Sequence, residues 1–227
     1  MTLHFEQELA VLKDKLLTMA GHAESAVNSA IKAVLRRDDD LARQVKEADS
    51  VMDQLEIEID DAAIQLLAKA PLASDLRLIT VAMKISHDLE RVGDEATTIA
   101  RRSLKLNQEP ELQSFQAIPQ MAEVALSMLR EALDAFVNRS PGKAREVIPR
   151  DKVVDALNKQ FHKEMIKLMQ ERQDAITRGL HLMVISKSLE RIADHATNIA
   201  EDVVYLYEAK DIRHSGKGQS SAPKEAA

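Results

Sequence analysis

The sequence predicts an all-α protein that duplicates an antiparallel three-helix bundle, with six helices in all. Hydrophobic residues make up 45% of the chain and aromatic residues only 3%. A core of aliphatic and methionine side chains favours packed helices over sheets. Helix breakers are few, six prolines and six glycines, and they are clustered. In addition, a motif from the first half of the chain recurs in the second half.

The first three helices follow from hydrophobic periodicity and from the residues that interrupt it. Apolar residues three and four positions apart predict a helix over Phe5–Leu35. Asp40 is suited to cap a second helix over Leu41–Lys69. Pro71 is expected to end this hairpin, and a third helix should then start at Ser74 or Asp75 and continue to about Leu106.

The second half repeats this order after a link at Asn107–Pro119, which contains two prolines. Its helices are expected at about 120–138, 143–170 and 174–210, with Pro149 either kinking the middle helix or delaying its start. The predicted domains are therefore 1–108 and 109–212. The residues 213–227, which are rich in Gly, Ser, Lys and Ala, are predicted to form a disordered tail.

The duplication is visible in the sequence itself. Leu89–Ala100 (LERVGDEATTIA) corresponds to Leu189–Ala200 (LERIADHATNIA), and seven residues between Arg37 and Asp53 recur in the same order between Arg139 and Asp155. Two ordered matches with nearly equal offsets indicate that each half folds as the same unit.

Composition excludes several classes of function. The chain has no cysteine, which rules out disulfides, thiol nucleophiles and cysteine-ligated metals. The net charge of -6 argues against a nucleic-acid-binding surface. No run of 18 apolar residues is present, and the first residues do not resemble a signal peptide. These features predict a soluble, cytoplasmic protein.

Acidic residues spaced by four are the main candidates for chemistry. Each half carries two such pairs, Asp49/Asp53 with Glu90/Asp94, and Asp151/Asp155 with Glu190/Asp194. A four-residue step places both carboxylates on one helix face, ~6 Å apart along the axis. Both pairs are equidistant from the expected hairpin turn, so we expect four carboxylates at one level in each bundle.

Like charges in this arrangement repel one another, and a bound cation would neutralise them. Oxygen ligands suit hard or borderline cations, and four carboxylates with few nitrogens favour a bridged multinuclear cluster over a single zinc ion. Asn198, one turn beyond Asp194, is a plausible extra ligand. His87, level with Glu56, is a weaker candidate, and His162 and His195 are expected to be surface residues. The alternative is a solvated acidic face neutralised by Arg91 and Arg191.

The two copies, Leu89–Ala100 and Leu189–Glu201, resemble the signature of the PhoU family over about residues 1–212. The resemblance implies a regulator of phosphate homeostasis that links the high-affinity phosphate ABC transporter to a sensor histidine kinase. It would repress the phosphate-starvation response when phosphate is plentiful. The resemblance further implies contact with the transporter ATPase subunit, a homodimer, and attachment to the membrane only through partners. It also implies one iron or zinc cluster per repeat at the acidic pairs.

Two other readings remain open. Carboxylates on facing helices also occur in di-metal enzymes such as oxidases, but the Glu-x-x-His motif of those bundles is missing. The chain could instead be a metal-free structural or interaction bundle, or a relative that serves a different transporter. No nucleophile–base pair or phosphate-binding loop indicates catalysis, so we expect a protein that is not an enzyme.

Overall fold

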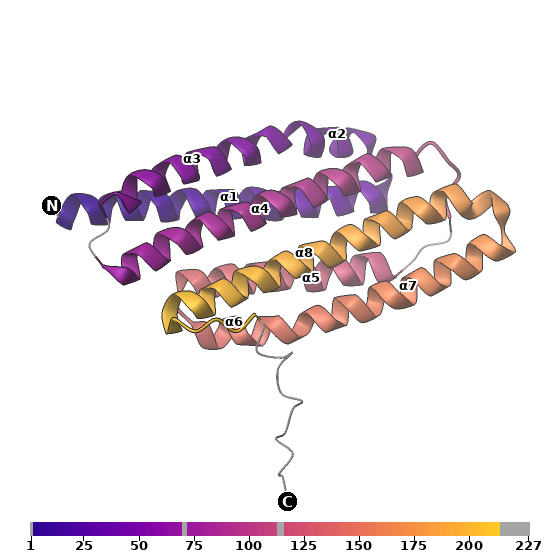
Figure 1. Cartoon of the computed structure of the whole chain (residues 1–227). Helices are drawn as coiled ribbons and strands as arrows, with labels where there is room; N and C mark the ends of the chain where they lie inside the picture. Colours follow the sequence, from indigo (N-terminus) through magenta and orange to yellow (C-terminus); the bar gives the residue numbers. More distant parts are fainter. Residues whose placement is uncertain (1, 70–71, 113–115, 214–227) are drawn as a thin grey trace, which may run out of the picture.

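The computed structural model describes residues 2–69, 72–112 and 116–213, which form helices and no strand (Figure 1). The first bundle contains α1 (Thr2–Arg36), α2 (Asp39–Glu47), α3 (Asp49–Leu67) and α4 (Ala73–Leu106). The second contains α5 (Ala117–Val137), α6 (Pro141–Val147), α7 (Asp151–Glu171) and α8 (Ile176–Glu208). The predicted all-α fold with its tandem bundles is confirmed. Pro71 and residues 214–227 of the predicted tail lie outside the described ranges.

The second helix of each bundle is broken, whereas the sequence predicted one helix over 41–69 and one over 143–170. Ala48 ends α2, donating its N–H to the Gln44 carbonyl, and α3 begins at the next residue. In the second bundle the short 3-10 helix η1 (Ile148–Arg150) separates α6 from α7, as the kink expected at Pro149 allows. Alanine favours helix, so the first break comes from tertiary packing and not from local propensity.

Two predicted boundaries also need correction. The link between the bundles ends before α5, and Pro119 lies in the first turn of that helix, where a missing N–H leaves no intrahelical bond unmade. The cap of α2 is Asp38 and not Asp40: its Oδ1 accepts a hydrogen bond of 2.9 Å from the Leu41 N–H. Arg37, at φ 55, makes the turn that leads into this cap.

Replacing Asp38 by alanine is expected to lower the free energy of unfolding by ~1 kcal/mol, because the first turn of α2 loses its side-chain acceptor. Chemical denaturation followed by circular dichroism would measure the difference. Asp40→Ala, which leaves the Leu41 N–H bonded, is the matched control and should change stability by less than ~0.5 kcal/mol. Equal losses in the two variants would show that Asp38 does not act as the cap.

The bundles meet along their last helices, α4 and α8, which run antiparallel and side by side (Figure 1). Polar contacts join them along most of their length: Lys84 with Asp202, Glu95 with Arg191, and Arg102 with His181. Around this seam, the buried side chains of α1, α3 and α4 continue into those of α5, α7 and α8 as one apolar core. The acidic pairs of α4 and α8 are therefore held by the two most central helices of the molecule.

Candidate functional site

The first acidic cluster lies where α3 begins against α4. The break at Ala48 places Asp49 in the first turn of α3, and Thr97 Oγ1 on α4 donates a 3.0 Å hydrogen bond to Asp49 Oδ1. Burial raises the pKa of Asp49 above its usual value, and the charges of Asp94 and Asp53 raise it further. Asp49, Asp53 and Asp94 are thus near neighbours, as the sequence predicted.

Glu90 occupies the far end of this cluster and is largely buried, with its side chain 14% exposed. Its Oε2 is buried and makes no hydrogen bond, although Arg91 Nε lies 3.3 Å away. Burial, and then the charge of Asp94, raise the pKa of Glu90. Arg91 also contacts Asp94 at 3.0 Å, so the predicted neutralisation of this cluster by Arg91 is partial.

The second cluster lies at the start of α7 against α8. Asp151 occupies the first turn of α7, and its Oδ1 is buried without a hydrogen-bond partner. Burial raises the pKa of Asp151 to about 6, and the charges of Asp194, Asp155 and Glu190 contribute to the shift. Burial followed by the charge of Glu190 also raises the pKa of Asp194. The four predicted carboxylates are therefore close enough to act on one another.

A hydrogen-bond donor and a cation both contact Glu190 in this second cluster. Asn158, which is buried, donates from Nδ2 to Glu190 Oε2 at 3.1 Å, and the Lys187 ammonium forms an ion pair with the same oxygen. Arg191, the expected neutralising residue, instead contacts Glu95 on α4 at 3.0 Å. The sequence did not predict this common contact of Asn158 and Lys187 with Glu190.

His87 and Glu56 form a further contact beside the first cluster. His87 Nδ1 lies 3.1 Å from Glu56 Oε1, and ligand atoms of Glu56, His87 and Glu90 all lie within 4.8 Å of one another. The level pairing of Glu56 with His87 in the sequence indicated this contact. His87 was predicted only as a weaker candidate ligand, because a single histidine at a surface is most often solvated.

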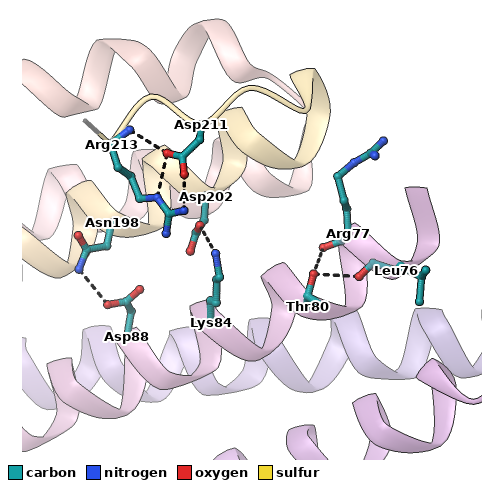
Figure 2. A network of polar contacts seen from close by, with 9 residues as sticks. All are labelled: Leu76, Arg77, Thr80, Lys84, Asp88, Asn198, Asp202, Asp211 and Arg213. Carbon is teal, nitrogen blue, oxygen red and sulfur yellow. Dashed lines mark hydrogen bonds and ion pairs between the residues drawn. The ribbon is translucent and has the colours of Figure 1, made fainter. Parts of the chain in front are cut away.

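Asn198, the predicted extra ligand of the second cluster, also makes a contact outside that cluster. Its Nδ2 donates to Asp88 Oδ1 on α4 at 3.2 Å, across the seam between the bundles (Figure 2). The same Asp88 oxygen lies 2.8 Å from His195 Nδ1, so His195 belongs to the seam, and its side chain is only 21% exposed, contrary to the expected surface position. His162 Nε2 lies 3.1 Å from Ser186 Oγ.

A cavity of about 170 Å³ adjoins Asp49, lined by polar and small residues that include Ser25, Ser29 and Thr97. Close packing of α3 on α4 closes its floor. A Cβ added at Gly93 would meet Met52 Cγ at 3.2 Å, so glycine allows this approach.

The arrangement suits cations more than anions. Both clusters concentrate carboxylates in partly buried surroundings, and the buried oxygens Glu90 Oε2 and Asp151 Oδ1 lack hydrogen-bond donors. A metal ion would supply the positive charge that such oxygens need. Free phosphate would be repelled by the same carboxylates. None of the described helices combines the length and apolar character that a membrane span requires.

Comparisons with known proteins identify the family. A family model described as "PhoU domain" matches residues 16–103 and again 118–203. A Pseudomonas putida protein named phosphate-specific transport system accessory protein PhoU homolog is 40% identical over 96% of this chain and 86% of its own length. A Pseudomonas aeruginosa protein of the same name is 41% identical over 93% of this chain and 88% of its own length.

Two solved structures agree with the fold. The crystal structure of PhoU from Pseudomonas aeruginosa superimposes with a TM-score of 0.88 at 40% identity, covering 91% of this chain and all of that one. The crystal structure of the phosphate transport system regulatory protein PhoU from Streptococcus pneumoniae superimposes with a TM-score of 0.85 at 31% identity. It covers 92% of this chain and 99% of that one. The family match covers both bundles, one domain in each, as the internal duplication requires. The chain is a member of the PhoU family.

Proposed function

We propose that this protein regulates phosphate homeostasis by linking the high-affinity phosphate ABC transporter to a sensor histidine kinase, and that it represses the phosphate-starvation response when phosphate is plentiful. The observation that carries this proposal is the match to relatives named as phosphate transport accessory proteins over 96% of the chain, both repeats included. The protein would act in the cytoplasm through surface contacts with the transporter ATPase subunit and the kinase, as a homodimer, and without catalysis.

The acidic clusters would hold metal in this role. Asp49, Asp53, Glu90 and Asp94 are the candidate ligands in the first repeat, and Asp151, Asp155, Glu190 and Asp194 in the second. A bound iron or zinc cluster would neutralise the carboxylates and fasten the start of α3 or α7 to its neighbour helix. Asn198 is not included, because its side chain faces Asp88. A di-metal enzyme is not favoured, since the Glu-x-x-His motif of such bundles is missing from the sequence.

Complementation tests the regulatory role. The full chain would be expressed in a bacterium whose own PhoU-family gene has been deleted and which carries a phosphate-starvation reporter. We expect the reporter, constitutively active in the deletion strain, to become repressed at high phosphate and to remain inducible when phosphate is removed. A reporter that stays active while the protein accumulates normally would contradict the proposal.

Elemental analysis of the full chain, purified without chelators, tests the metal role separately. We expect bound iron or zinc, and a loss of roughly half of it in Asp151→Asn/Asp155→Asn, because one of two clusters is removed. Glu146→Gln, which changes an exposed carboxylate of α6, should leave the metal content unchanged. Metal-free wild-type protein that still restores repression would separate the regulatory role from metal binding.

A further inference from the structure

The two repeats differ beside the buried glutamate of each acidic cluster, Glu90 in the first repeat and Glu190 in the second. We call this position the glutamate corner. In the first repeat, Glu90 faces Glu56 on α3 and His87 one turn earlier on α4. In the second repeat the corresponding residues are Asn158 and Lys187, and both contact Glu190 Oε2. The same position in the fold therefore carries two further metal-ligand side chains in one repeat and a hydrogen-bond donor with a permanent cation in the other.

The second repeat shows what this position requires. The glutamate side chains are buried to the same degree, 14% exposed for Glu90 and 15% for Glu190. Glu190 Oε2 receives an ammonium and an amide donor, whereas Glu90 Oε2 is buried with no hydrogen bond. Arg91 Nε, 3.3 Å away, is the nearest cation to Glu90 Oε2 and is shared with Asp94. A buried carboxylate oxygen that accepts no hydrogen bond and shares its one arginine with Asp94 favours a further cation at the first-repeat position.

The ligand set is suited to a borderline transition metal. One imidazole nitrogen and two carboxylates match the His/Glu sites that Zn²⁺ uses, with the fourth position left to solvent. The three ligand atoms already lie within 4.8 Å of one another. Glu56 and His87 are on facing helices, and the side chain of His87 is 58% exposed, so an ion has direct access.

We propose that Glu56, His87 and Glu90 bind one Zn²⁺-class ion in the first repeat, and that Lys187 replaces that ion in the second. The site shares Glu90 with the carboxylate cluster proposed above, but its imidazole ligand makes it chemically distinct. It does not depend on the role in phosphate regulation. The two repeats then differ at the glutamate corner. A metal ion holds α3 against α4 in the first repeat, whereas α7 is held against α8 without metal in the second.

Titration of the chelator-treated full chain with Zn²⁺ tests the site, followed by NMR of protein labelled with 15N-histidine. The chain has seven histidines, and the His87 signal is identified by its absence in His87→Gln. We expect the first equivalent of Zn²⁺ to shift the ring nitrogen signals of His87. Glu56→Gln should weaken this binding about tenfold or more. His162→Gln on α7 is the matched control and should bind Zn²⁺ as the wild type does.

Exchanging the residues of the glutamate corner between the two repeats provides a second test. Glu56→Asn/His87→Lys should remove the imidazole-bound equivalent while preserving the fold, because the second repeat already uses these residues. Asn158→Glu/Lys187→His should create a second imidazole-bound equivalent. Zn²⁺ binding without any change in the His87 signals would show carboxylate-only binding and overturn the proposal, as would the absence of Zn²⁺ binding. Both results come from purified protein, so they are separable from failure of complementation.

Discussion

Replacing Phe161 by alanine is expected to lower the free energy of unfolding by about 3 to 5 kcal/mol, because a fully buried ring is lost and a cavity remains. Phe161 lies in α7 between the acidic cluster and the tip of the second hairpin, and its side chain packs in the shared core. Its removal should therefore loosen the contact of α7 with α8 that brings Asp155 level with Glu190.

Urea denaturation of the full chain would measure the loss, with Phe161→Leu as the control. Leucine fills much of the same volume, so the control should cost roughly 1 kcal/mol. A Phe161→Ala variant as stable as the wild type would mean that the site collapses around the smaller side chain. In that case α7 would be free to move relative to α8, and the position of the second cluster would need revision.

Replacing Asp151 by asparagine is expected to stabilise the metal-free protein at pH 7. The pKa of Asp151 is about 6 in the folded chain, against 3.8 for an unperturbed aspartate, chiefly because of burial. Between these two values the folded state binds more protons than the unfolded state, so stability falls as pH rises from about 4 to 6. Allowing for solvent screening of a half-exposed group, the ionised form costs ~1–2 kcal/mol at pH 7.

Urea denaturation of chelator-treated protein across pH 4 to 7.5 would test this dependence. The advantage of Asp151→Asn over the wild type should be largest at pH 7 and shrink toward pH 4, where Asp151 is protonated in the folded state and about half protonated in the unfolded state. Glu146→Gln should stay within ~0.5 kcal/mol of the wild type throughout. Added iron or zinc should then stabilise the wild type more than the variant. An advantage that persists unchanged at pH 4 would rule out ionisation of Asp151 as the cause.

Much of the site followed from the sequence because helices have a fixed period. Residues four apart share a face, and residues equidistant from a hairpin turn lie at one level. These rules correctly paired Asp49 with Asp94 and Asp151 with Asp194, and they placed Glu56 level with His87. The internal duplication made the prediction stronger, since the same spacing appeared in both halves.

Other features required the packed structure. The helix break at Ala48 has no local signal, since alanine favours helix, and it nevertheless sets the position of Asp49 at the start of α3. Spacing along α8 placed Asn198 one turn beyond Asp194, but it did not predict the contact of Asn198 Nδ2 with Asp88 on α4. Spacing along the sequence predicts the helical turn on which a side chain lies. The contacts that its functional group makes depend on the neighbouring helix.

The sequence by itself determined the all-α class, the duplicated bundle and the residues that carry the acidic clusters, because these depend on periodicity and order along the chain. Only the tertiary structure decided that the two clusters are unequal. Lys187 and Asn158 neutralise Glu190, while the buried oxygen of Glu90 has no hydrogen bond. The four residue types can be read from the sequence, but the atoms that they contact depend on side-chain directions across two packed helices.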